Sequence, residues 1–147
     1  MEIETFVLCD AATDYRGKLN ILGTFDTIWG SKLPVTWPHC ALALRVRFAR
    51  IEEGEHRVRI GFMDEDGRQV LPPLDGTVRV GFGPKTGTVA ANLILNIDRV
   101  RLEREGEYSI SLAIDGRQER ALPLYLRLRP EQQKSGEAGE GEAWKEG

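Results

Sequence analysis

Apolar residues alternate with small or charged ones in Leu42-Ala-Leu-Arg-Val-Arg-Phe48 and again in Val58-Arg-Ile-Gly-Phe62. Strict alternation is typical of a β-strand with one buried and one solvated face, because successive side chains of a strand point in opposite directions. Between the two segments, Glu52-Glu-Gly54 fits a three-residue hairpin loop that ends on a glycine. The pattern therefore predicts two antiparallel strands joined as a hairpin.

The loop also sets an expected register for this hairpin. Pairing Ile51 with Glu55 places Val46 opposite Ile60, so that both apolar side chains lie on the buried face. The same loop chemistry recurs at Arg104-Glu-Gly106, which predicts that the strands on either side of it also pair with each other.

Further segments extend the two-residue period along the chain: residues 3–9, 19–29, 77–82, 89–97, 108–114 and 120–128. No stretch keeps apolar residues at helical spacing for three turns. Turn-forming residues separate most of the segments, as in Asp115-Gly116. Together they predict an all-β fold, a two-sheet antiparallel β-sandwich of eight to nine strands.

Three positions predict irregular strands. Gly23 suggests a kink within residues 19–29. The alternation changes parity around Asp98-Arg99, which indicates either a bulge or a strand that crosses between the sheets. Pro123 lacks the backbone N–H that a central strand needs, so its segment is expected to lie on an edge or at a bulge.

The charge of the chain is unevenly distributed. Its 147 residues include 20 Lys+Arg and 23 Asp+Glu, a net charge of -3. Residues 130–147 hold two lysines and five glutamates, which leaves 18 basic and 18 acidic residues in 1–129. Trp144 is the one large apolar residue of that last segment, too little to offset the entropy of ordering it. We predict a β-sandwich domain over 1–129 and a disordered acidic tail over 130–147.

Composition also argues against two classes of function, nucleic-acid binding and membrane insertion. The neutral, lysine-poor body argues against nucleic acid as a partner. No apolar run approaches the roughly 20 residues of a membrane-spanning helix, and the acidic start of the chain is unlike a targeting leader. A cytoplasmic protein without membrane contact is therefore expected.

Residues that carry catalysis or bind metals are sparse. Cys9 and Cys40 lie in apolar strand-like runs and are expected to be reduced core thiols. No arrangement of the two cysteines and two histidines predicts an enzyme, a cofactor or a metal site. Asp64-Glu-Asp-Gly67 resembles the beginning of a calcium loop but lacks its distant glutamate. It favours a plain hairpin turn, with a weak calcium site as the alternative.

Loop aromatics form one candidate binding site. Trp29 and Trp37 flank a short loop, and Tyr15 lies in an earlier turn. Exposed rings could form a platform on which a sugar or a peptide stacks. The alternative is that both tryptophans close one end of the sandwich.

Arginines form the second candidate. In the expected hairpin register, the outward-facing side chains gather on one face: Arg45, Arg47, Arg57 and Arg59. Like charges that face each other across strands disfavour the pairing, so something must compensate. Carboxylates on a neighbouring strand or aromatic rings under the arginine stems would do so. The functional alternative is an anionic ligand, polymer or partner surface.

One set of short motifs runs through most of the chain: Thr5-Phe-Val-Leu-Cys-Asp-Ala-Ala12, Gly17-Lys-Leu-Asn-Ile-Leu-Gly-Thr-Phe-Asp-Thr-Ile28, Ile51-Glu-Glu-Gly-Glu-His56, Leu71-Pro-Pro-Leu74, Asn92-Leu-Ile-Leu-Asn96, Gly106-Glu-Tyr-Ser-Ile110 and Ile114-Asp-Gly-Arg-Gln118. Together these motifs resemble a family of small bacterial and archaeal proteins known only as a domain of unknown function. The resemblance implies a compact β-sandwich of prokaryotic cytoplasmic origin. It implies no activity, ligand or catalytic residue.

The sequence favours a non-enzymatic interaction or structural module. Its partner would be another protein, or a second copy bound through a sheet face or edge. The alternative is a small-molecule or carbohydrate binder that uses Tyr15, Trp29 and Trp37.

Overall fold

Nine strands and one short 3-10 turn make up residues 1–130, the part of the chain that the computed structural model describes. The elements are β1 (Glu2–Tyr15), β2 (Lys18–Thr24), β3 (Thr27–Gly30), β4 (Val35–Ala49), η1 (Arg50–Glu52), β5 (Gly54–Met63), β6 (Gln69–Val80), β7 (Thr88–Leu102), β8 (Gly106–Ile114) and β9 (Arg117–Leu128). The prediction of an all-β chain is confirmed. Of the predicted tail, only Pro130 is described, and Trp144 lies outside the described residues.

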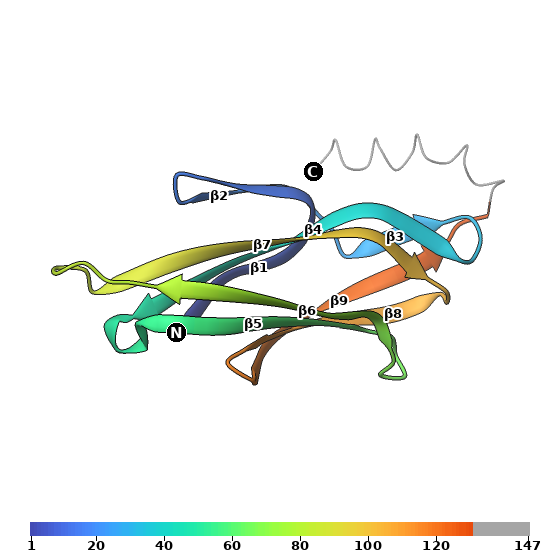
Figure 1. The fold of residues 1–147 in the computed structure, drawn as a ribbon. Coiled ribbons are helices and arrows are strands. Elements are labelled where there is room, and N and C mark those ends of the chain that lie inside the picture. Colours follow the sequence, from blue (N-terminus) through green and yellow to red (C-terminus); the bar gives the residue numbers. More distant parts are fainter. Residues whose placement is uncertain (131–147) are drawn as a thin grey trace.

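The strands form two packed sheets, which confirms the predicted sandwich (Figure 1). One sheet has the order β2-β1-β4-β7, and the other has the order β3-β9-β8-β5-β6. Neighbouring strands are antiparallel except β3, which runs parallel to β9. This parallel pair is the one departure from the expected antiparallel pattern among the described strands.

The alternating segments supply the core as expected. The even-numbered residues of β4 from Leu42 to Phe48 are buried, as are Val58, Ile60 and Phe62 of β5. Each such side chain stabilises the fold by roughly 1.5–3 kcal/mol when it is fully buried. Both predicted strands therefore exist, with the predicted faces inward.

The predicted β4–β5 hairpin is wrong, because the two strands lie in different sheets. β4 pairs with β1 and β7, whereas β5 pairs with β6 and β8, and η1 carries the chain from one sheet to the other. The loop at Arg104-Glu-Gly106 likewise crosses between the sheets, from β7 to β8. Alternation identifies the inward side chains, but it does not distinguish a partner in the same sheet from one in the facing sheet.

The predicted irregularities have mixed outcomes. Residues 19–29 are not one kinked strand: they divide into β2 and β3, which belong to different sheets. Ile97 and Val100 are both buried, so the parity does change near Asp98-Arg99. However, β7 stays in its sheet in unbroken register with β4. The change of parity occurs at Arg99, whose backbone is in the left-handed region with a φ of 56°. The expected bulge or crossing is therefore wrong. Pro123 precedes the β3 pairing, which begins at Tyr125, so it lies on a local edge as predicted.

The β1–β2 hairpin adds a partial third layer that the sequence did not predict. The first half of β1 pairs with β4, whereas its second half pairs with β2. Beyond Cys9 the hairpin lies above the four-stranded sheet, on the side away from β5 (Figure 1). Cys9, Ala41 and Ala43 are fully buried beneath it, and the partly buried side chains packed on them are Val7, Ala12, Leu19 and Ile94.

Both cysteines are free and buried, as predicted. Desolvation, with the nearby Cys9 thiol and two carboxylates, raises the pKa of Cys40 to about 11. Desolvation also raises the pKa of Cys9, whose Sγ lies 3.4 Å from the carbonyl oxygen of Ala41. Both groups therefore stay neutral at physiological pH and serve as packing.

Candidate functional site

The predicted arginine face is divided between the two sides of the sandwich. Arg45 and Arg47 belong to β4 in the four-stranded sheet, whereas Arg57 and Arg59 belong to β5 in the five-stranded sheet. Because their side chains point away from the core in both sheets, the two pairs lie on opposite outer surfaces. The expectation that all four share a face is therefore wrong, and it fails with the hairpin register on which it depended.

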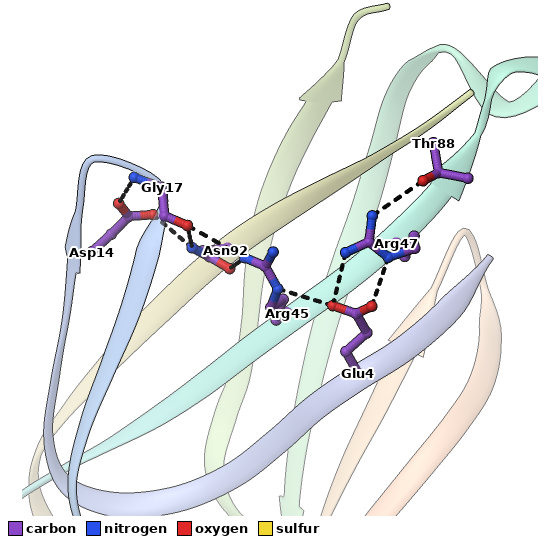
Figure 2. A network of polar contacts seen from close by, with 7 residues as sticks. All are labelled: Glu4, Asp14, Gly17, Arg45, Arg47, Thr88 and Asn92. Atoms are coloured by element: carbon purple, nitrogen blue, oxygen red, sulfur yellow. Dashed lines mark hydrogen bonds and ion pairs between the residues drawn. The ribbon is translucent and has the colours of Figure 1, made fainter. Parts of the chain in front are cut away.

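A carboxylate on the neighbouring strand neutralises the β4 pair (Figure 2). The β1–β4 register shifts between Ile3 and Thr5, and Glu4 at this bulge extends its carboxylate between the two arginines. Arg45 Nε donates to its Oε1 at 2.9 Å, and Arg47 Nε donates to its Oε2 at 2.6 Å. The hydrogen bond from Arg47 is the largest effect on the pKa of Glu4, which is lowered despite partial desolvation. Of the two structural compensations that the sequence left open, the structure shows the carboxylate on a neighbouring strand for this pair.

A second set of contacts ties the β1–β2 hairpin to the sheet. Arg45 Nη1 donates to Asn92 Oδ1 at 3.0 Å, and Asn92 Nδ2 donates to Asp14 Oδ2 at 2.9 Å and to the carbonyl oxygen of Gly17 at 3.2 Å (Figure 2). The two-residue turn Arg16-Gly17 has φ values of 53° and 79°, as a type I′ hairpin turn requires. We refer to Asp14, Gly17, Arg45 and Asn92 as the latch.

The latch and the Glu4 contacts together contain two arginines and two carboxylates, so their formal charges balance: Glu4 bonds both arginines, and Asp14 bonds Asn92 and the Gly17 N–H. Arg47 makes a further contact, from Nη1 to Thr88 Oγ1 at 3.1 Å. On the opposite outer surface, Arg59 lies 3.8 Å from Asp75. A role of these arginines in binding an anion or a partner remains a prediction, and the arrangement around Glu4 serves to hold three strands together.

Asn92 of the latch lies on β7, and β7 forms one edge of the four-stranded sheet. Along residues 1–130, β7 has a pairing partner on the β4 side and none on the other. From Thr88 to Ile97 it contains ten consecutive residues without a charge or a proline. Edge strands normally carry such interruptions because their free N–H and C=O groups can otherwise pair with another chain.

The other long edge is interrupted in this way. β6 forms the end of the five-stranded sheet and contains Pro72, Pro73, Asp75 and Arg79. Proline removes a hydrogen-bond donor, and a charged side chain on an edge disfavours a dry contact with another strand. The stretch Thr88–Ile97 of β7 is thus the uncharged edge without proline, and the sequence shows this only once the strand order is known.

The three predicted aromatics do not form one surface. Tyr15 is 61% exposed beside the hairpin turn, where the Arg16 guanidinium lies 5.2 Å from its ring centroid. Trp29 on β3 is 49% exposed and lies under the Arg129 guanidinium at 4.5 Å. Trp37 packs on the core near Phe25 at 6.0 Å between ring centroids. The β1–β2 turn and β3 lie at opposite ends of the sandwich (Figure 1).

The Asp64–Gly67 segment is a hairpin turn between β5 and β6, as favoured. Asp64 Oδ1 accepts hydrogen bonds from the backbone N–H groups of Asp66 and Arg68, both at 2.9 Å. Arg104 Nη2 lies 3.0 Å from Asp64 Oδ2 and 2.8 Å from Asp66 Oδ2, so a guanidinium stands between the two carboxylates. The described portion of the chain contains no group of three or more side chains suited to hold a metal ion.

Residues 4–127 match the model of a family of unknown function (DUF6941). The chain belongs to this family. The match spans nearly the whole sandwich and confirms the resemblance to an uncharacterised domain, although family membership assigns no ligand and no reaction. A search of curated proteins finds no match. Within residues 1–130, no helix has the length and apolar character needed to cross a membrane.

In this DUF6941 member, the structure places His56 in a cluster that the sequence did not predict. Its Nδ1 lies 2.7 Å from Asp115 Oδ2, and its Nε2 lies 2.5 Å from the carbonyl oxygen of Glu52. Its ring stacks on Phe48 with 4.6 Å between centroids. Desolvation alone would lower its pKa, but the hydrogen bonds and the charges of Asp115 and Glu52 outweigh it and raise the pKa above 6.5.

This cluster predicts a stability that falls in mild alkali. Because the pKa of His56 is raised in the folded state, protonation stabilises the fold fully below about pH 6.5, and this contribution is lost as the pH rises through the folded-state pKa. We expect the urea concentration at the unfolding midpoint to decrease as the pH is raised from about 6 to about 9. In His56→Gln this decrease with pH should be smaller. His39→Gln is the control, because His39 is 42% exposed, against 13% for His56. An equal slope in wild type and His56→Gln would refute the assignment.

Proposed function

We propose that this protein is a non-enzymatic interaction module that accepts an extended strand of a partner along the free edge of β7. The observation that carries the proposal is the ten-residue stretch Thr88–Ile97, which is regular, uncharged and paired on one side only in the described chain. Such an edge supplies backbone hydrogen bonds for affinity, while alternate side chains distinguish partners.

The packing around β7 supports the proposal. The inward-facing Val89, Ala91, Leu93 and Leu95 rest against the core, and Ile97 is part of it, so the inner face of the edge strand is anchored along this stretch. On the outer face, Asn92 is held by the latch and Ile94 packs under the hairpin. A rigid edge loses little conformational entropy when a strand adds to it.

The alternative function, a small-molecule or carbohydrate binder, is not favoured. It required Tyr15, Trp29 and Trp37 to share a surface. The β1–β2 turn beside Tyr15 and the strand β3 that carries Trp29 lie at opposite ends of the sandwich (Figure 1). Two buried free thiols agree with a reducing compartment, so a cytoplasmic location is part of the proposal.

A phage-displayed library of random decapeptides, selected on the immobilised full-length protein, tests the proposal. We expect the enriched peptides to alternate apolar residues and to lose at least tenfold in affinity for the double variant Ala90→Lys/Asn96→Lys, because the new charges lie along the β7 edge. The matched control is Gln69→Lys/Thr77→Lys, which adds the same charge at two exposed positions of β6. The proposal fails if no peptide is enriched, or if both double variants bind the peptides equally.

A further inference from the structure

We infer that the strand bound by β7 is β7 of a second copy of this chain, so that two four-stranded sheets join into one continuous sheet of eight strands. This inference rests on the proposed function, since it names the partner of the same edge. An antiparallel pair of identical strands has a twofold axis, and closed twofold dimers are the commonest assembly of identical chains.

The alternation of β7 limits where the axis can pass. Residues directly opposite each other in an antiparallel pair must point to the same face. The inward residues of β7 from Val89 to Ile97 have odd numbers. Two copies therefore match their faces only when the axis passes through a residue and not between two residues, since an axis between residues would place inward side chains opposite outward ones.

An axis through Leu93 places the residues from Val89 to Ile97, all of them uncharged, opposite one another. On the inner face it places Leu93 beside its own copy and pairs Ala91 with Leu95 and Val89 with Ile97, so the small side chain meets a large one. On the outer face it pairs Ala90 with Asn96 and Asn92 with Ile94. The same axis leaves Asp98 opposite Thr88 at the end of the strand, whereas an axis one residue further along would bring Asp98 opposite Ala90 and Arg99 opposite Val89.

The latch disfavours the neighbouring axis on the other side. The tip of each β1–β2 hairpin is bonded to Asn92 through Asp14 and Gly17. An axis through Asn92 would place the two Asn92 residues directly opposite each other, so the two tips bonded to them would lie side by side. With the axis at Leu93, the two Asn92 residues are offset by two residues, roughly 7 Å along the strands at 3.4 Å per residue, so the tips pass each other.

Charge also permits two copies to approach. Residues 1–129 carry equal numbers of basic and acidic residues, so the sandwiches do not repel each other at long range. β6 lies next to β7 but in the other sheet, and its prolines and charges keep it from joining the pairing. The second sheet of each copy therefore ends at the junction while the β7 sheets continue across it.

Sedimentation velocity on the full-length protein is the first measurement. We expect a concentration-dependent dimer whose dissociation constant rises tenfold or more in Ala90→Lys/Asn96→Lys and is unchanged in Gln69→Lys/Thr77→Lys. Monomeric wild type at every concentration would overturn the inference. If the decapeptides still bind that monomer, the strand-accepting function stands and only the second copy is excluded as its partner; if they do not, both fail.

Cysteine crosslinking then tests the register. Ala90→Cys and Asn96→Cys are prepared as separate variants, since the native thiols Cys9 and Cys40 are buried. Under mild oxidation we expect the mixture of the two variants to form a disulfide-linked dimer at least tenfold faster than either variant alone, because directly opposite residues have Cα atoms within disulfide reach. Crosslinking that is equally fast in the separate variants would overturn the Leu93 axis.

Discussion

Replacing Phe48 with alanine is expected to lower the free energy of unfolding by about 3–5 kcal/mol, the usual cost of deleting a buried aromatic side chain. Phe48 is 1% exposed at the end of β4 and reaches into the space between the two sheets. Its ring also supports His56, so the truncation removes both core packing and one wall of the His56 cluster. Urea denaturation at pH 6 measures the change.

Ile51→Ala is the control for this experiment. Ile51 is three residues further along the chain and 93% exposed, so its truncation should change the free energy of unfolding by no more than about 0.5 kcal/mol. The prediction is refuted if the two variants lose the same stability. A smaller alkaline slope in Phe48→Ala than in wild type would additionally show that the stacking holds His56 against Asp115.

Replacing Ala43 with leucine is expected to destabilise the protein by about 1–3 kcal/mol and to loosen the β1–β2 hairpin. Ala43 points away from the main core, yet it is fully buried because the hairpin covers it. Val7 and Ile94, its partners on the two neighbouring strands, pack on the same buried cluster, so a larger side chain must push the hairpin outward. Amide hydrogen exchange in β2 should become faster, since the hairpin must move outward.

Ala113→Leu is the matched control. Ala113 also faces outward from a central strand, but it lies on β8 in the five-stranded sheet and is only half-buried. The same added bulk there should leave stability and exchange nearly unchanged. If Ala43→Leu behaves like Ala113→Leu, the hairpin does not rest on the sheet in solution.

The contrast between these two alanines explains one limit of sequence reading. Both occupy the outward positions of an alternating strand, and a small residue there is compatible with a solvated surface. The full burial of Ala43 depends on a hairpin whose own strand leaves the sheet after Cys9. Nothing in the local pattern around Ala43 reports that distant segment.

Glu4 illustrates the same limit for the polar contacts. The sequence predicted that a carboxylate on a neighbouring strand could neutralise Arg45 and Arg47, and this is confirmed. Which carboxylate does so depends on β1 lying beside β4 and on the bulge that brings Glu4 between the arginines. Residues 41 to 43 positions apart in the chain meet there, so only the strand order could identify it.

The period of two in the segments around Leu42 and Val58 determined the strands, their inward faces and the all-β class. These are local properties, because the direction of a side chain follows from the backbone of its own strand. The strand neighbours, the division of the arginines, the latch and the exposed β7 edge were decided by tertiary structure alone. A buried apolar face is satisfied equally by a partner in its own sheet or by one in the facing sheet. The choice between the two is made by the packing of the whole chain, in which η1 carries β4 and β5 into different layers.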